Sequence, residues 1–195
     1  MSNININIIK VVQYIRATGE IIMSGTTCST EGMENDDVGI ITDVSADIHN
    51  QYVLDGEIVD KPPQPSAIHY FDYSSKSWVD PRSLEDHKTA QWTLIKAARS
   101  EAEFGGFTWD GSMFDSDQVS QARIQGAVLL ATSNPDFVVD WTLADNTVRS
   151  LTADDLIAIS QALGEHISLQ HTRARNARAL LDQATTLSEV QSISF

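Results

Sequence analysis

The feature that most constrains the fold is a change after Pro81 from strand-forming to helix-forming residue patterns. Before this residue, short β-branched runs alternate with turn-forming residues. After it, the segment SLEDHKTAQWTLIKAARSEAEF contains helix formers throughout. We therefore expect an α+β protein, with a β-hairpin-rich module over residues 1–81 and a helical module with two short β-hairpins over residues 82–195.

Three hairpins are predicted before Pro81. The runs IKVVQYI and EIIMSG flank RATGE, whose glycine favours a tight turn. Asp55-Gly56 lies between YVL and EIV and is the strongest short hairpin signal, and the polar turn Ser74-Ser75-Lys76 joins a third pair of strands. The acidic stretch STEGMENDDVGIITDVSADIHN is expected to form loops around one short strand.

A helix is predicted to start after Ser83. Ser83 can act as its N-cap, and acidic residues occupy the first turn, where they favour the helix dipole. Apolar residues recur at nearly helical spacing along this segment, which predicts one buried face: Leu84, Trp92, Ile95 and Ala102.

The helical module repeats one local pattern twice: a hairpin, a cap and a helix. In FTWDGSMF, Asp110-Gly111 suits a type I′ turn, which would pair Phe107 with Phe114 and place the aromatic rings on one face. Asp117 then precedes a helical segment that it can cap. The second copy has a turn at Asp145-Asn146, followed by Thr152 as the cap, with Asp155 in the capping-box position.

These turn and cap roles explain the acidic residues without a bound ion. The alternative is a calcium site built from Asp110, Asp115 and Asp117, but their spacing matches no EF-hand loop. We expect no metal, cofactor-binding or catalytic residues. His166 and His171 are five residues apart, which points them to different helix faces.

A long C-terminal helix carries apolar residues at a spacing close to seven residues per two turns. This seam could contact a second copy of the chain or pack within one chain, and the sequence favours neither alternative. Three arginines, Arg173, Arg175 and Arg178, are expected to favour the dipole near the helix end, and the tail TTLSEVQSISF is expected to dock as a short strand or to lie loose. The seam consists of Leu156, Ile159, Leu163, Ile167, Ala174, Ala177 and Leu181.

Composition excludes several classes of function. A net charge of −14 and a pI near 4.5 argue against nucleic acid as a partner, since phosphate binding needs clustered cations. Cys28 has no second cysteine to pair with, and no set of residues shows zinc-ligand spacing. The N-terminal apolar run is interrupted by Asn and lacks a basic start, so we expect neither a signal peptide nor membrane insertion.

Three segments of the predicted helical module resemble a known family. GGFTWDGSMFDSDQVSQARIQGA, WTLADNTVRSLTADDLIAI and QALGEHISLQHTRARNARALLD resemble a domain of unknown function that is common in tail proteins of tailed bacteriophages, often tail fibre or tail fibre assembly proteins. The likeness runs from about Ser83 to Ala184. It implies a component of the virion tail, made in the host cytoplasm, and it brings no catalytic residues with it.

The sequence and this resemblance leave three readings of function. The first is a non-enzymatic structural component of a phage tail, in a fibre, baseplate or adaptor, that contacts other tail proteins and forms a homo-oligomer. The second is a tail fibre assembly chaperone that is absent from the mature virion, and the third is a tail-associated glycan hydrolase that uses two of the many carboxylates. No nucleophile elbow, phosphate-binding glycine loop or His-Glu-x-x-His motif supports an enzyme.

Overall fold

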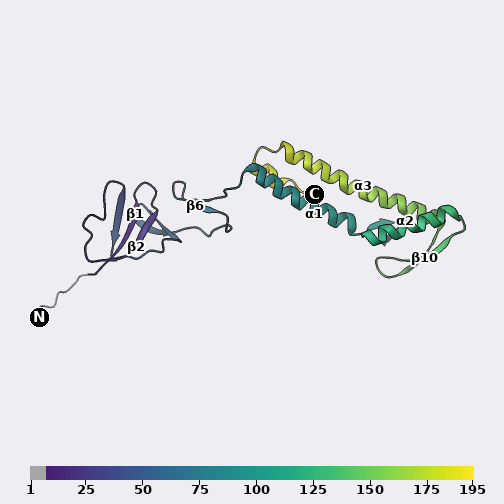
Figure 1. Ribbon diagram of the computed structural model, residues 1–195, viewed down its shortest axis with the longest axis horizontal. Coiled ribbons are helices and arrows are strands. Elements are labelled where there is room, and N and C mark those ends of the chain that lie inside the picture. The colour runs from purple at the N-terminus through teal and green to yellow at the C-terminus, as the bar shows by residue number, and fades with distance from the viewer. Residues whose placement is uncertain (1–7) are drawn as a thin grey trace. The chain divides into compact units, whose positions relative to one another are not determined.

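The computed structural model describes residues 8–195, and the chain divides into two compact units, Met1–Pro81 and Arg82–Phe195. Figure 1 shows strands in the first unit and long helices with short hairpins in the second. The α+β class predicted from the sequence is therefore confirmed. Residues 1–7 lie outside the described residues. The N-terminal apolar run, from which we expected no signal peptide, begins among them.

The first unit is built around a three-stranded antiparallel sheet. Its strands are β1 (Ile9–Ile15), β2 (Ile21–Thr27) and β3 (Val38–Thr42), in the order β2-β1-β3. The predicted first hairpin is β1 with β2, and the short strand expected in the acidic stretch is β3. The sequence did not predict that β3 adds to β1 on the side opposite β2.

The two other hairpins of this unit form at the predicted turns. Strand β4 (Gln51–Leu54) pairs with β5 (Glu57–Asp60), and β6 (Tyr70–Asp72) pairs with β7 (Ser77–Val79). Asp55, Gly56 and Lys76 all have positive φ, as tight turns of this kind require. Phe71 lies at the centre of an aromatic cluster with Tyr52, Tyr73 and Trp78.

The second unit follows the predicted order of helices and hairpins. Two antiparallel hairpins separate the three long helices, and a fourth, short helix ends the chain. The elements are α1 (Leu84–Phe104), β8 (Phe107–Trp109), β9 (Ser112–Phe114), α2 (Gln118–Ser133), β10 (Val138–Thr142), β11 (Val148–Thr152), α3 (Ala153–Gln183) and α4 (Leu187–Ser192).

Helices α1 and α3 pack side by side in opposite directions. Two contacts show this: His166 of α3 reaches Ala102 near the end of α1, and Arg178, later in α3, lies over Trp92 in the first half of α1. Helix α2 packs on the first half of α3. Two separate apolar clusters result. We call the first the hairpin core: Phe107, Phe114, Ile124, Ala131, Leu143, Leu151, Ala153, Leu156, Ile159 and Leu163. The second is the terminal core: Ile95, Ala174, Ala177, Leu181, Ala184 and Val190.

The candidate oligomer seam of α3 packs inside the chain. Leu156, Ile159 and Leu163 are buried in the hairpin core, and Ile167 packs partly against it. Ala174, Ala177 and Leu181 belong to the terminal core. The structure thus favours intrachain packing over contact with a second copy, because α1, α2 and α4 already cover the seam.

Two further predictions for the C-terminal region were wrong. The tail is neither a strand nor loose: Thr186 and Glu189 form a capping box that starts α4, and Val190 is buried in the terminal core. No basic residue occupies the last turn of α3. Instead the Arg173 guanidinium lies over the ring of Phe195, 4.2 Å from its centroid. This arginine therefore contacts the C-terminal residue of the tail through a cation–π interaction and does not lie at the end of the helix.

Candidate functional site

The turn and cap residues lie where the sequence placed them. Asp110 and Gly111 have φ angles of 44° and 73°, and Asn146 has a φ of 65°. Asp117 accepts hydrogen bonds from the amides of Val119 and Ser120 at the start of α2. Thr152 caps α3 in a complete capping box with Asp155, while Asp145 accepts from the amide and hydroxyl of Thr147 in the second turn.

Arg149 joins the two hairpins of the second unit. Its guanidinium forms an ion pair with Asp110 and donates to the Asp110 carbonyl oxygen and the Ser112 hydroxyl, at 3.2 and 2.9 Å. It also lies over the Trp109 ring. The Asp110 carboxylate is thus occupied by a cation of the chain itself. Among the described residues, no three metal-binding side chains gather around one point, so the calcium alternative has no geometric support.

Ser116 is a buried residue that the sequence did not single out. Its hydroxyl donates to the Glu103 carbonyl oxygen at 2.6 Å and accepts from the Gly106 amide at 2.9 Å. These groups belong to the end of α1 and the loop after it. The side chain therefore satisfies the end of one helix while its neighbour Asp117 caps the next.

A polar layer separates the hairpin core from the terminal core. His166 lies 2.9 Å from the Ala102 carbonyl oxygen, and His171 lies 3.2 Å from the Glu103 carboxylate. The two histidines were expected on different helix faces, but both reach the last turn of α1. Gln170 is buried between them and accepts a hydrogen bond from Arg173. Because each ring has a partner on α1, this layer fits a structural role.

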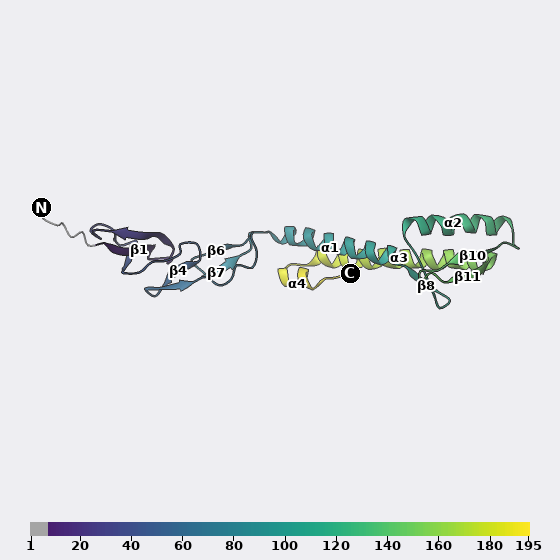
Figure 2. The same ribbon diagram turned by 90° about the horizontal axis from the view of Figure 1, so that it is seen from below.

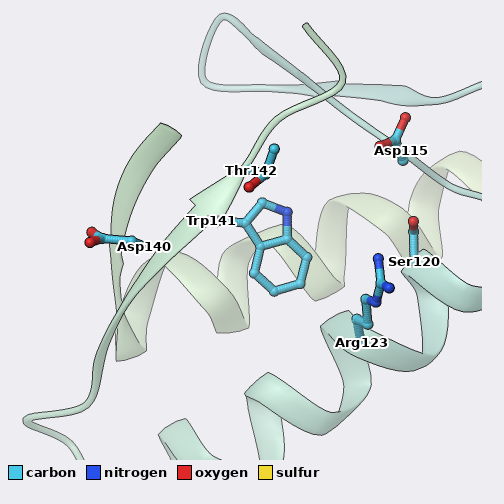
Figure 3. Close-up of a pocket in the computed structure, with 6 residues that line it drawn as sticks. All are labelled: Asp115, Ser120, Arg123, Asp140, Trp141 and Thr142. Carbon is cyan, nitrogen blue, oxygen red and sulfur yellow. The ribbon is translucent and has the colours of Figure 1, made fainter. Parts of the chain in front are cut away.

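A polar pocket of about 270 Å³ lies between β10 and the start of α2 in the helical unit. Figure 3 shows the Trp141 ring between β10 and the helix that carries Ser120 and Arg123. Asp140 precedes Trp141 on the strand and points to its other side. The remaining lining residues are Asp115 and Thr142.

The two carboxylates of this pocket do not converge on one point. Asp115 and Asp140 are both exposed, and Figure 3 shows their carboxylates on opposite sides of Trp141. A second hollow, of about 610 Å³, lies between the end of α3 and α4 and includes Leu180, Glu189 and Ile193.

Large apolar side chains remain exposed on all three long helices of the second unit. Leu94 on α1 and Leu169 on α3 are more than half exposed. On α2 the same holds for Val119, Leu129 and Leu130, and the exposed fraction of Leu129 reaches 73%. Burial of these side chains in a contact with another protein would remove their apolar area from water, which stabilises an assembly.

Residues 86–194 match the family described as a domain of unknown function (DUF4376). Since the match covers more than half of the sequence, the chain belongs to this family. No curated protein matches the chain. No solved structure matches it either. No helix in residues 8–195 combines the length and apolar character needed to cross a membrane.

Proposed function

We propose that this member of the DUF4376 family is a non-enzymatic structural component of a bacteriophage tail that acts through protein–protein contacts. It would be made in the host cytoplasm and reside in the virion tail, as part of a fibre, baseplate or adaptor. The proposal rests first on the motifs that resemble phage tail proteins. The structural observation that carries it is the set of exposed apolar side chains on α1, α2 and α3.

Burial of the exposed leucines would stabilise such protein–protein contacts. Transfer of one exposed leucine side chain into an apolar contact stabilises an assembly by about 1.5 to 3 kcal/mol. Leu94, Leu129, Leu130 and Leu169 together therefore give a driving force that contact with other subunits would use.

The β-rich unit suits a separate docking role. Strands β2 and β3 form the two edges of its sheet, so each has a row of backbone amide and carbonyl groups that no further strand within residues 8–195 pairs with. An extended segment of a neighbouring tail protein could add to either edge. We therefore propose that the β-rich unit docks on the tail while the helical unit makes the remaining subunit contacts.

The chaperone alternative uses the same exposed apolar side chains differently. A chaperone would cover the fibre protein transiently and then leave, whereas a structural protein stays in the particle. The exposed leucines fit both roles. The glycan hydrolase alternative is less well supported, because the carboxylates of the polar pocket are exposed and lie on opposite sides of Trp141.

Quantitative mass spectrometry of purified phage particles tests the proposal. We expect peptides from both units of the protein at a fixed ratio to known tail proteins. Detection in the infected cell lysate but not in the particles would contradict the structural role and support the chaperone.

A further inference from the structure

Helix α2 is apolar on two opposite faces. One face packs into the hairpin core through Ile124 and Ala131, with Val128 partly buried beside them. The other face lies about half a turn away at helical spacing and points to solvent. We call it the outer stripe: Val119, Ala122, Gly126, Leu129, Leu130 and Ser133. Figure 2 shows that no other element of the helical unit covers this side of α2.

The outer stripe is also the least negative helical surface of the unit. The chain has a net charge of −14, yet α2 contains no Asp or Glu, and its one charged residue is Arg123. The three other helices each carry acidic residues. Two copies of so acidic a chain repel one another least where both surfaces lack carboxylates, and physiological salt screens charges beyond about 8 Å.

Side-chain size along the stripe is complementary about Gly126. A Cβ atom added at Gly126 would meet no atom within 4 Å, so the helix backbone is open to a close neighbour at this point. Four residues before Gly126 stands the small Ala122, and four residues after it stands the large Leu130. A second copy that runs in the opposite direction would place Ala122 against Leu130 and Gly126 against Gly126, so the two backbones could approach closely at the glycines.

We propose that the outer stripe binds a second copy of this chain, with two α2 helices crossing antiparallel about a twofold axis at Gly126. Such a contact is isologous, because each helix offers the same surface to the other. It places Leu130 of one copy over Ala122 of its partner. It also brings Arg123 toward the last turns of the partner's α2, where free carbonyl groups favour a cation.

The contact is expected to be weak in dilute solution. One stripe on one helix buries less than the roughly 1,200 Å² of total surface that stable complexes use, so we expect a dissociation constant on the order of 10 to 100 µM. In a particle that holds several copies near each other, the high local concentration would favour formation of the α2–α2 contact.

Cysteine crosslinking of the full-length protein tests the geometry. In a Cys28→Ser background, a single Gly126→Cys substitution lies on the twofold axis, and mild oxidation should link two copies rapidly. Val119→Cys is the matched control on the same stripe. An antiparallel pair centred on Gly126 separates the two 119 positions by about 21 Å along the helices, too far for a disulfide. Mixing Ala122→Cys with Leu130→Cys should produce the mixed dimer.

Sedimentation velocity of the otherwise unchanged chain gives the second readout. Gly126→Leu adds bulk at the crossing point without adding charge, and it should weaken dimerisation at least tenfold. Its thermal midpoint should not fall, because the site is open and leucine has the higher helix propensity. Gln125→Leu adds similar bulk beside the stripe and should change the dissociation constant less than threefold.

Two results would overturn the inference. Efficient linkage through Val119→Cys would indicate parallel pairing. A wild-type chain that stays monomeric at several hundred micromolar and does not crosslink through Gly126→Cys would exclude the contact itself. The inference rests on the proposed function, because a phage particle would supply the high local concentration. The experiments nevertheless distinguish failure of the tail role from failure of the α2 pair. A dimer that is missing from phage particles removes the tail role alone, and a monomer that is present in particles removes the α2 pair alone.

Discussion

The guanidinium of Arg149 lies 5.0 Å from the centroid of the Trp109 ring and forms an ion pair with Asp110 in the neighbouring turn. Arg149 comes from β11, whereas Trp109 and Asp110 come from β8 and the turn after it. One side chain therefore fastens the two hairpins of the helical unit together. Sequence patterns place each hairpin but give no indication of this contact.

Arg149→Ala should destabilise the helical unit by about 1 kcal/mol. The cation–π contact accounts for about 0.5 to 1 kcal/mol. The Asp110 side chain is 66% exposed, so water screens the ion pair and we assign it little more. Urea unfolding followed by helical circular dichroism measures the effect. Arg175→Ala, at an exposed helical position that contacts Thr172, is the control and should stay within about 0.5 kcal/mol of the wild type. Equal effects of the two substitutions would contradict the fastening role.

Ser116→Ala should cost about 2 kcal/mol. The substitution leaves the Glu103 carbonyl group and the Gly106 amide without their side-chain partner in a buried position. The measurement is again the free energy of unfolding. Ser150→Ala, on the exposed face of β11, provides the control for removal of a hydroxyl group. If both variants unfold at the same urea concentration, the Ser116 contacts contribute nothing.

Gly111→Val should lower stability by about 1 kcal/mol or more, because a β-branched residue resists positive φ. The cost is conformational rather than steric, since a Cβ atom at this position meets nothing within 4 Å. Gly111→Asn separates the two causes: asparagine tolerates this backbone region, so its thermal midpoint should lie close to that of the wild type. A variant with asparagine as unstable as the one with valine would argue against this explanation.

Acid should destabilise the helical unit through its helix caps. A hydrogen bond from the Ser120 hydroxyl, joined by the amides of Ser120 and Val119, holds the pKa of Asp117 below its ordinary value of 3.8. The amide and hydroxyl of Thr152 lower the pKa of Asp155 in the same way. Because the unfolded chain binds these protons more tightly, the contribution of both caps is complete above about pH 4 and is lost as pH falls through the lower folded pKa values.

Thermal unfolding between about pH 5 and pH 2 measures this effect. We expect the wild-type midpoint to fall over the acid part of this range. The double variant Asp117→Asn, Asp155→Asn should start lower and depend less on pH, because neither cap titrates. A variant with the full wild-type pH dependence would show that other carboxylates are responsible.

Local signals predicted most of this fold. Asp55-Gly56 and Asp110-Gly111 identified two of the hairpins, and Ser83 and Thr152 identified the starts of two helices, because turns and caps depend on residues close in sequence. The near-heptad spacing of α3 likewise predicted a buried seam. It could not indicate what covers the seam, because helix spacing is the same whether the partner is α1 of one chain or a second copy.

The features that the sequence did not reveal depend on distant residues. Ser116 reaches Glu103 from beyond the β8–β9 hairpin, 13 residues away in sequence, and Arg149 reaches Asp110 from a strand that lies 39 residues away. The exposed stripe of α2 was missed for a related reason. Its sequence, QVSQARIQGAVLLATS, is apolar on both faces, and only the packing of Ile124 shows which face is inside.

The central claim is that the exposed apolar side chains of the helical unit hold this protein in a phage tail. The most direct test is the copy number of Leu129→Glu in purified particles, measured by quantitative mass spectrometry against a known tail protein. Gln125→Glu, which adds the same charge beside the outer stripe, is the control. We expect the control at the wild-type copy number and Leu129→Glu reduced at least tenfold, with an unchanged thermal midpoint in isolation. Incorporation of Leu129→Glu at the wild-type copy number, in particles of normal infectivity, would contradict the claim.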